Sequence, residues 1–427
     1  MKLDNKEFGF DNFSAEMAKL KNEKHFDYLV TIVGEDFGEE GLGCIYILEN
    51  TKNHERISVK QIAKKVGETD YVIPSVIKLW HDADLLEREV FDFLGIKFLG
   101  HPDMRRLFLR NDFEGYPLRK DFDMSPEHNR FPMTDEPESD WTSEWNLNQF
   151  GELVETKHRL FDTDDFVMNF GPNHPSMHGV LRLQTVVNGE TVKRIYPHLG
   201  YIHRGIEKMM ENMTYPQTLA LTDRLNYLCA MTNRHALVGV IEEAMGVELS
   251  DRIKYIRTIM DELQRIDNHL LFLGTCAQDL SALTAFLYCM RDREHVLNVM
   301  EETTGGRLIQ NYYRIGGLQA DIDPNFVANT KALCKYLEPM VQEYLDVFGD
   351  NVITHQRLEG VGPMNEPDCI NYGVTGPAGR ASGWHNDVRK NHPYALYDKV
   401  DFDEITGTDG DSMTRYMIHI KEIYQSL

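Results

Sequence analysis

The chain has 427 residues and a formal net charge of −23. Its length allows two domains with cores of their own. The acidic balance argues against nucleic acid or an anionic lipid surface as a partner, because both attract an excess of Lys and Arg. No run approaches the roughly 18 consecutive apolar residues of a membrane span, and the opening residues lack a signal-peptide pattern. We therefore expect a soluble or peripheral chain on the cytoplasmic side.

The cysteines argue against a metal cluster held by this chain. An iron–sulfur cluster needs four thiolates, usually partly in closely spaced pairs, and no C-x-x-C occurs here. Nucleotide-binding glycine motifs are also missing. We therefore expect no metal and no cofactor held by the chain itself. The six cysteines are Cys44, Cys229, Cys276, Cys289, Cys334 and Cys369.

The first domain is predicted to be a small α+β domain over residues 1–123. An amphipathic helix is indicated over residues 82–96, where apolar residues recur every three or four positions. The other predicted elements are helices over 10–24 and 58–68 and strands over 25–35, 43–50 and 71–80.

Two irregular segments follow this domain. Residues 98–122 are basic, aromatic and rich in turn residues, and they fit either a surface arm with solvated charges or an arm lying on an acidic partner. Residues 124–165 are acidic, interrupted by three prolines and without a sustained period. We interpret the second segment as a linker.

The second predicted domain, residues 166–427, opens with a hairpin that carries two histidines. The loop 171–179 holds His174 and His178, and its glycines and prolines exclude a helix. Alternating strands surround it, and the Asn188-Gly189 pair marks a tight turn. Both histidines are therefore expected at the tip of a strand–loop–strand unit.

A helical bundle is predicted after this hairpin. A short helix is expected over 202–213, and a long one over 218–246 that ends at Gly246. The next helix, 250–274, has an apolar stripe of three- and four-residue steps, which is typical of a core-facing helix. Further helices are predicted over 282–306, 323–350 and 411–427, with a long irregular stretch over 373–402.

Several polar side chains could carry chemistry. The loop histidines could bind a metal together with His198 and His203, or they could hydrogen-bond a polar ligand and donate protons. No carboxylate or cysteine stands at ligand spacing, so we expect no metal site.

The predicted helix 218–246 places Asp223, Arg224 and Tyr227 on one face. Tyr227 is either a core residue or a proton donor to a developing anion, such as a reduced quinone oxygen. Asp279 is flanked by apolar segments, so burial would raise its pKa unless a cation such as a histidinium pairs with it.

The motifs resemble those of respiratory complex I, NADH:quinone oxidoreductase. Residues 85–122 closely resemble its C subunit. The segments NFGPNHPSMHGVLRL, PHLGYIHRGIEKMME, LTDRLNYL, NYYRIGG, GPAGRASG and DVRKNHPY, in this order, resemble its D subunit. The resemblance implies that the C and D subunits are fused, with a hydrogenase-like helical fold in the D part, which is expected to be incomplete at its C-terminus.

The resemblance also implies roles for single residues. His178 and Tyr227 would flank the quinone headgroup, with His174 and Met177 in the same loop. Asp279 would pair with His178. Arg224 would lie against the terminal 4Fe-4S cluster of the B subunit, a partner in the complex.

Electrons from that cluster would then reduce menaquinone or ubiquinone, while His178 and Tyr227 stabilise the developing charge and deliver protons. Altered pairing of His178 with Asp279 would start the coupling to proton pumping. The implied partners are the B subunit, the H subunit and the rest of the membrane arm. The implied location is the cytoplasmic side of the inner (cell) membrane, peripheral to it, and activity is expected only within the complex.

Two departures from the family pattern change these expectations. Met177 stands where threonine is common. Ile309 and Gln310 stand where many ubiquinone-using members have a histidine near the cluster, which favours a cluster potential that varies little with pH and a quinone such as menaquinone. The alternatives are a membrane-bound hydrogenase-like protein, disfavoured because Asn226 replaces one cysteine of the motif that ends at Cys229, and a non-catalytic assembly scaffold.

Overall fold

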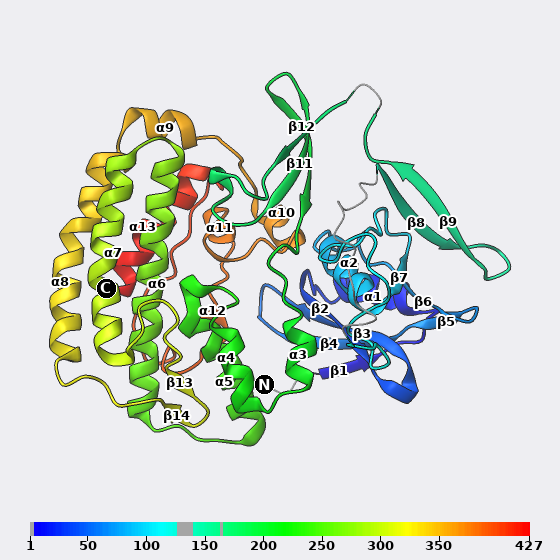
Figure 1. Ribbon diagram of the computed structural model, residues 1–427, viewed down its shortest axis with the longest axis horizontal. Coiled ribbons are helices and arrows are strands. Elements are labelled where there is room, and N and C mark those ends of the chain that lie inside the picture. The colour runs from blue at the N-terminus through cyan, green and yellow to red at the C-terminus, as the bar shows by residue number, and fades with distance from the viewer. Residues whose placement is uncertain (1–3, 126–139, 163–164) are drawn as a thin grey trace. The chain divides into compact units, whose positions relative to one another are not determined.

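The computed structural model describes residues 4–125, 140–162 and 165–427, and it divides into two compact units (Figure 1). The first unit contains Met1–Lys208 and Asn371–Gly373, and the second contains Met209–Ile370 and Val374–Leu427. Strands dominate the first unit and helices dominate the second. This confirms the predicted α+β class. The domain division into 1–123, 124–165 and 166–427 stays a prediction.

The first unit begins with a four-stranded sheet in the order β1-β4-β3-β2. Its strands are β1 (Asp4–Glu7), β2 (Tyr28–Asp36), β3 (Leu42–Glu49) and β4 (Arg56–Ile62). Helix α1 (Phe13–Asn22) buries Phe13, Met17 and Leu20 in a core shared with Tyr46 and Trp80. These buried side chains recur at helical spacing in α1, which explains why that segment is helical.

The segment 58–68 is not the predicted helix. Residues 56–62 form β4, which pairs with β1 on one side and β3 on the other, and Lys64–Val66 forms β5. The lysines, glutamine and alanine of this segment favour a helix locally. Alternating Ile57 and Val59, both buried, instead complete a sheet between two neighbours, and this tertiary pairing outweighs the local propensity.

A five-stranded sheet follows in the order β5-β6-β7-β8-β9. Its other strands are β6 (Asp70–Pro74), β7 (Ile96–Leu99), β8 (Trp141–Leu147) and β9 (Leu153–Arg159). The last two lie within the segment interpreted as a linker, whose residues 126–139 lie outside the described part. Strands β8 and β9 pair antiparallel with each other, so their backbone groups hydrogen-bond within this sheet. The sequence pattern did not predict these two strands.

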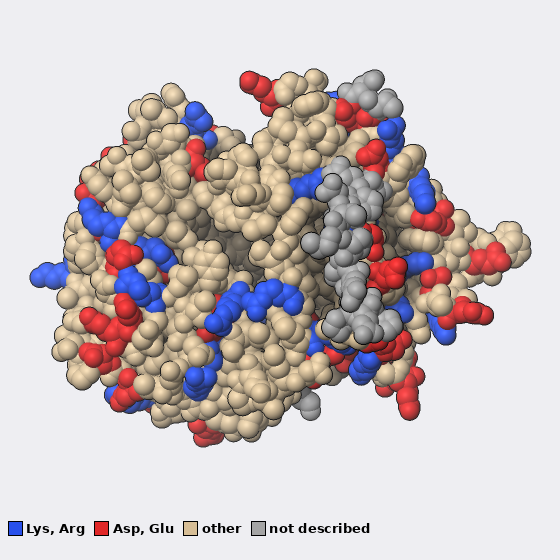
Figure 2. Space-filling view, in the orientation of Figure 1, with Lys and Arg blue, Asp and Glu red and all other residues tan. Residues whose placement is uncertain are grey.

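The basic arm 98–122 is held by charges within the first unit. Arg105 pairs with Asp103 at 2.6 Å between Nη2 and Oδ2, and Arg110 pairs with Asp112 at 2.8 Å. Arg106 lies against the buried Asp92. These arginines are therefore paired within the first unit and not simply solvated, and an acidic partner for the arm stays a prediction. On the face shown in Figure 2, basic and acidic side chains are interspersed.

Helix α2 (Ala83–Leu94) carries a buried carboxylate, Glu87. Its oxygens accept hydrogen bonds from Ser75 Oγ at 2.6 Å and from the Val76 amide at 2.7 Å. Burial raises the pKa of Glu87 to about 7, although nearby His101 and these donors oppose the shift. The folded state therefore prefers the protonated carboxyl.

Stability of this region should consequently fall as the pH rises. The contribution of Glu87 to stability is fully present below its ordinary pKa of 4.5 and is lost as the pH rises through about 7. Glutamine cannot ionise, so the free energy of unfolding of Glu87→Gln at pH 8 should exceed that of the wild type by up to roughly 3 kcal/mol. This figure uses about 1.4 kcal/mol per pKa unit. Hydrogen exchange of α2 at pH 5 and pH 8 measures this, and an equal difference at both pH values would contradict it.

The predicted hairpin forms a third sheet in the order β10-β11-β12. Strands β10 (Phe166–Phe170), β11 (Arg182–Asn188) and β12 (Thr191–His198) are antiparallel. The turn at Asn188-Gly189 has Gly189 at φ +62°, as predicted. One face packs on Leu160 and Phe161. The connection between β10 and β11 is the histidine loop.

The second unit is a helical bundle in which α6, α7 and α8 run side by side (Figure 1). Its core contains residues from α5, α6, α7, α8 and α13, among them Val238, Leu263, Leu270, Leu337 and Ile423. Two short strands, β13 (Tyr313–Arg314) and β14 (Gly317–Leu318), pair beside it. The α-helices that follow β12 in the chain are α3 (Ile206–Glu211), α4 (Tyr215–Thr222), α5 (Ala230–Met245), α6 (Asp251–Asp279), α7 (Leu283–Thr304), α8 (Phe326–Tyr344), α9 (Val352–Leu358), α10 (Glu366–Asn371), α11 (Gly376–Ala381), α12 (Val388–Asn391) and α13 (Ser412–Ser426).

Candidate functional site

The histidine loop is closed tightly at its base. Gly171 has φ +82°, and a Cβ there would lie 1.9 Å from the carbonyl oxygen of Leu181, so only glycine fits. Asn173 and Val180 form an isolated antiparallel bridge. The loop therefore projects as a short, defined excursion from β10 and β11.

Both histidines of this loop are exposed. His174 caps the 3-10 turn Pro175–Met177, and its Nδ1 accepts a hydrogen bond from the Ser176 amide at 3.2 Å. His178 follows the turn in the left-handed region, with φ +46°. Met177 is half-buried. The two imidazoles are thus presented to solvent on either side of one turn.

A metal site built from four histidines finds no support in these positions. His203 stacks on Phe93 with ring centroids 5.0 Å apart, and its Nε2 lies 3.5 Å from Glu207. His198 Nε2 lies 3.1 Å from Gln184 Oε1. Across the parts of the chain that the structure describes, no three His, Cys, Asp or Glu side chains come together as metal ligands.

The predicted helix 218–246 is interrupted, and Tyr227 lies in the interruption. Helix α4 ends at Thr222 and α5 begins at Ala230, with a 3-10 turn at Tyr227–Cys229 between them. Asn226 is extended at φ −130°, and its side chain accepts a hydrogen bond from the Leu228 amide at 3.3 Å. This side-chain capping competes with the helix, which is why the apolar period did not predict the break.

The interruption also separates the residues expected on one helix face. Asp223 is buried and pairs with Arg234 at 2.8 Å between Oδ2 and Nη1. Arg224 is exposed, and its Nη1 donates to the Ala220 carbonyl at 2.7 Å. Tyr227 is 51% exposed. The prediction that these three share one face is therefore wrong: Asp223 is structural, whereas Arg224 and Tyr227 are accessible.

Asp279 is exposed at the end of α6. The expectation of a buried carboxylate is therefore wrong for this chain by itself, because the helix ends there and its apolar neighbours face the other way. His178 belongs to the first unit and Asp279 to the second. Their pairing stays a prediction.

The structure shows polar neighbours of Tyr227 that the sequence analysis missed. Gln264 of α6 donates from Nε2 to the Leu228 carbonyl at 2.9 Å, and Asn268 Nδ2 lies 3.1 Å from Cys229 Sγ. In the sequence, the only indication of these contacts was that Gln264 and Asn268 lie four positions apart, among the apolar residues of the predicted helix 250–274. At the predicted cluster-facing position, Gln310 is buried and donates to the Arg307 carbonyl at 3.1 Å, while Ile309 is partly exposed.

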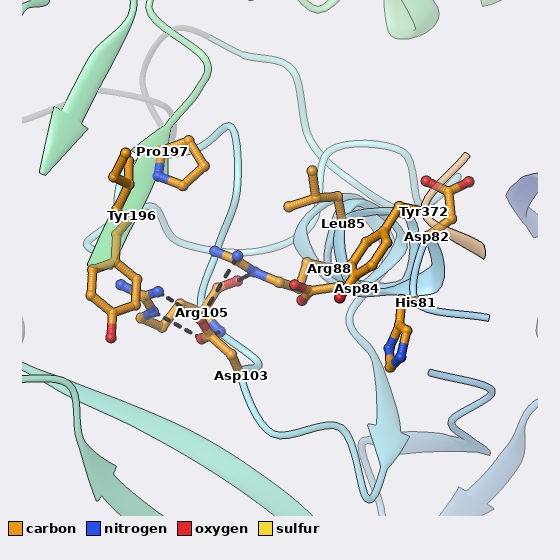
Figure 3. Close-up of a pocket in the computed structure, with 11 residues that line it drawn as sticks. His81, Asp82, Asp84, Leu85, Arg88, Asp103, Arg105, Tyr196, Pro197 and Tyr372 are labelled. Atoms are coloured by element: carbon orange, nitrogen blue, oxygen red, sulfur yellow. Dashed lines mark hydrogen bonds and ion pairs between the residues drawn. The ribbon is translucent and has the colours of Figure 1, made fainter. Parts of the chain in front are cut away.

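The first unit also holds a pocket of about 340 Å³ that none of the predicted site residues lines (Figure 3). Arg88 from α2, together with Asp103 and Arg105, forms its charged wall, and Tyr196 of β12 lies beside Arg105. Arg105 also lies over the Tyr196 ring at 5.3 Å. Arg88 and Arg105 both pair with Asp103, and the titratable side chains His81, Asp82 and Asp84 also line the pocket.

The cysteines are all free thiols. Burial raises the pKa of the Cys229 thiol, against the hydrogen bonds from Thr232 and Asn268. No helix of the described residues is both long enough and apolar enough to cross a bilayer.

Comparison with known proteins places the chain in a class. Residues 10–128 match the respiratory-chain NADH dehydrogenase 30 Kd subunit, and residues 279–427 match the 49 Kd subunit. The chain is thus an oxidoreductase subunit of the respiratory NADH dehydrogenase class, with both subunits in one polypeptide.

The relatives narrow this class to one family. The C/D subunit of NADH-quinone oxidoreductase from Phocaeicola vulgatus is 54% identical over 412 residues, which are 96% of this chain and 79% of that protein. The C/D subunit from Bacteroides fragilis is 53% identical over 423 residues, with the same coverage. The C/D 2 protein of Aquifex aeolicus is 38% identical over 424 residues, covering 96% of this chain and 71% of that protein. The chain belongs to the family of NADH-quinone oxidoreductase C/D subunits, which confirms the predicted fusion of the C and D subunits.

Proposed function

We propose that this chain forms the quinone-reduction site of a proton-translocating NADH:quinone oxidoreductase. The observation that carries the proposal is the setting of Tyr227. The residue is 51% exposed, while the Asn226 carbonyl before it accepts a hydrogen bond from Asn233 and the Leu228 carbonyl after it accepts one from Gln264. A phenol held in this way can meet a ligand without first being ordered.

The chemistry follows from the two kinds of donor. Reduction of a quinone to a quinol adds two electrons and two protons, and negative charge develops on the two carbonyl oxygens. Tyr227 and His178 each hydrogen-bond one oxygen, stabilise that charge and deliver a proton. A 4Fe-4S cluster in the B subunit, a partner in the complex, supplies the electrons.

The remaining site residues have supporting roles in this proposal. Asp279 pairs with His178, and a change in that pairing on proton loss begins the coupling to pumping. His174 and Met177 shape the loop beside the headgroup. Arg224, whose guanidinium is exposed, lies against the partner's cluster.

The proposed setting is a peripheral position on the cytoplasmic side of the cell membrane. The partners are the B subunit and the membrane arm, including the H subunit, and the chain is active only with them. The substrate is menaquinone or ubiquinone. The similarity to C/D subunits of NADH-quinone oxidoreductases supports this function over a non-catalytic scaffold.

Replacement of Tyr227 by phenylalanine tests the proposal directly. Removal of the hydroxyl takes away a hydrogen-bond and proton donor, and general acid catalysis contributes about 10²- to 10⁴-fold. We expect quinone reduction per assembled complex to fall by at least about tenfold, measured in membranes in which the amount of complex is quantified.

Tyr255→Phe provides the matched control, because Tyr255 is a similarly exposed tyrosine, on α6. It should leave the rate unchanged. Full activity of Tyr227→Phe in assembled complex would remove Tyr227 from the reaction and leave the proposal without its main support.

A further inference from the structure

Helix α6 presents a row of four polar side chains, three buried and the last half-buried, toward α5 and the Tyr227 turn. The row is spaced by four, three and four residues, so it lies along one helix face. Its first two members pair with residues of α5: Arg257 with Glu242 at 2.8 Å and Asp261 with His235 at 2.6 Å. Its last two members, Gln264 and Asn268, reach the turn.

Gln264 and Asn268 hold the turn just after Tyr227. The Gln264 amide nitrogen donates to the Leu228 carbonyl at 2.9 Å, and the Asn268 amide nitrogen lies 3.1 Å from Cys229 Sγ. Because Leu228 and Cys229 directly follow Tyr227 in the chain, these contacts set the position of the backbone that carries the phenol.

Further contacts hold the turn from its other side. The Asn226 side chain accepts from the Leu228 amide at 3.3 Å, and Asn233 of α5 donates to the Asn226 carbonyl at 3.1 Å. The residues immediately before and after Tyr227 are therefore both tied down. Of these contacts, the one from Gln264 comes from the most deeply buried side chain, at 1% exposed.

Gln264 is itself held in one orientation. Its Nε2 also donates to Asp267 Oδ2 at 3.1 Å, and Asp267 pairs with Arg293 of α7 at 2.8 Å between Oδ1 and Nε. The buried Asp267 carboxylate can only accept, so it requires the nitrogen of the Gln264 amide, not its oxygen, to face it. That nitrogen is the atom that reaches Leu228. Burying an ion pair adds little stability, whereas it does fix an orientation.

We propose that Gln264 is a positioning residue for Tyr227, held by the Asp267–Arg293 pair and acting through the Leu228 carbonyl. The inference rests on the proposed role of Tyr227 in quinone reduction. Gln264 does not touch the quinone; it fixes the backbone beneath the phenol. A displacement of about 1 Å at a reacting group can cost about 100-fold in rate, so loss of this contact should lower catalysis without removing the phenol.

The first variant is Gln264→Met, which keeps the side-chain length and removes the donor. We expect kcat for quinone reduction per assembled complex to fall about tenfold, with the quinone KM changed less than about twofold. A purely structural role would lower the amount of complex and leave kcat unchanged. Gln61→Met is the matched control, because Gln61 is also buried and its Nε2 donates to a backbone carbonyl, that of Ile62, at 2.7 Å.

A double variant then shows whether Gln264 acts through Tyr227. If it does, Gln264→Met should lower the rate no further once Tyr227→Phe is present, because coupled residues are not additive. Equal losses in both backgrounds would overturn the inference. Inactive Tyr227→Phe with fully active Gln264→Met would also overturn it while leaving the proposed function intact, whereas full activity of Tyr227→Phe would end both.

Gln264→Glu keeps the inference testable if the methionine variant does not assemble. A protonated glutamic acid can donate to the Leu228 carbonyl, and an ionised one cannot. The rate relative to wild type should therefore rise as the pH falls. The ionisable groups near this position include Asp267, whose pKa burial raises to about 6 although Arg293 lowers it, Glu294, and Cys229, whose thiol pKa burial raises. A relative rate that does not change between pH 6 and pH 8 would contradict the inference.

Discussion

Replacing Asp92 by alanine should destabilise the first unit by roughly 3–5 kcal/mol, the usual cost of removing one partner of a buried ion pair. Asp92 is fully buried. One carboxylate oxygen accepts from the backbone amides of Leu107, Phe108 and Leu109 at 3.1, 2.7 and 2.9 Å. The other lies 2.9 Å from Arg106 Nη1. Without the carboxylate, three backbone donors lose their acceptor, and the Arg106 guanidinium loses its counter-charge while it keeps its backbone acceptors.

This loss should appear in the basic arm before it appears elsewhere. Hydrogen exchange of the amides of Leu107, Phe108 and Leu109 measures it, together with urea unfolding of the full chain. Glu114→Ala is the control, since Glu114 lies exposed in the same arm and such surface changes stay within about 0.5 kcal/mol. Unchanged protection of the arm in Asp92→Ala would show that other contacts hold it.

Replacing Glu242 by glutamine should lower the free energy of unfolding of the second unit by about 3–5 kcal/mol, because it also removes one partner of a buried ion pair. Glu242 and Arg257 form a bidentate ion pair, in which Arg257 Nη1 lies 2.9 Å from Glu242 Oε2 and Arg257 Nη2 lies 2.8 Å from Glu242 Oε1. Arg257 is 1% exposed and also donates to the carbonyls of Arg314 and Gly317 at 3.0 Å. The neutral amide leaves a buried cation without its counter-charge.

Two companions separate the charge from the shape. Glu243→Gln, at the exposed neighbouring position, should change urea unfolding of the full chain by less than about 0.5 kcal/mol. The double variant Glu242→Met with Arg257→Met should regain much of the free energy of unfolding that Glu242→Gln loses, because two apolar side chains need no counter-charge. If Glu242→Gln unfolds at the same urea concentration as the wild type, the pair contributes nothing to this unit.

Much of the fold was predictable because it depends on local patterns. The Asn188-Gly189 turn, the apolar stripe of α6 and the glycine that ends α5 at position 246 are each set by neighbours within a few residues. The prediction of a helix over residues 58–68 was wrong, because local pattern does not decide the structure of this segment. Its composition favours a helix, but burial between β1 and β3 makes it a strand, and which neighbours it will have is not visible locally.

The features of the candidate site likewise fall into those that local sequence specifies and those that the tertiary structure specifies. The sequence by itself determined which side chains are present and where the backbone must turn: the two histidines of a loop that glycine and proline keep from being helical, a tyrosine in the RLNYL motif, and the family to which these belong. Only the tertiary structure decided that Asp223 is buried against Arg234 while Tyr227 stands exposed, and that Asp279 is not enclosed. It also decided that Gln264 reaches the Tyr227 turn. The physical reason is that burial and hydrogen-bond partners come from residues distant in sequence, so no local period can specify them.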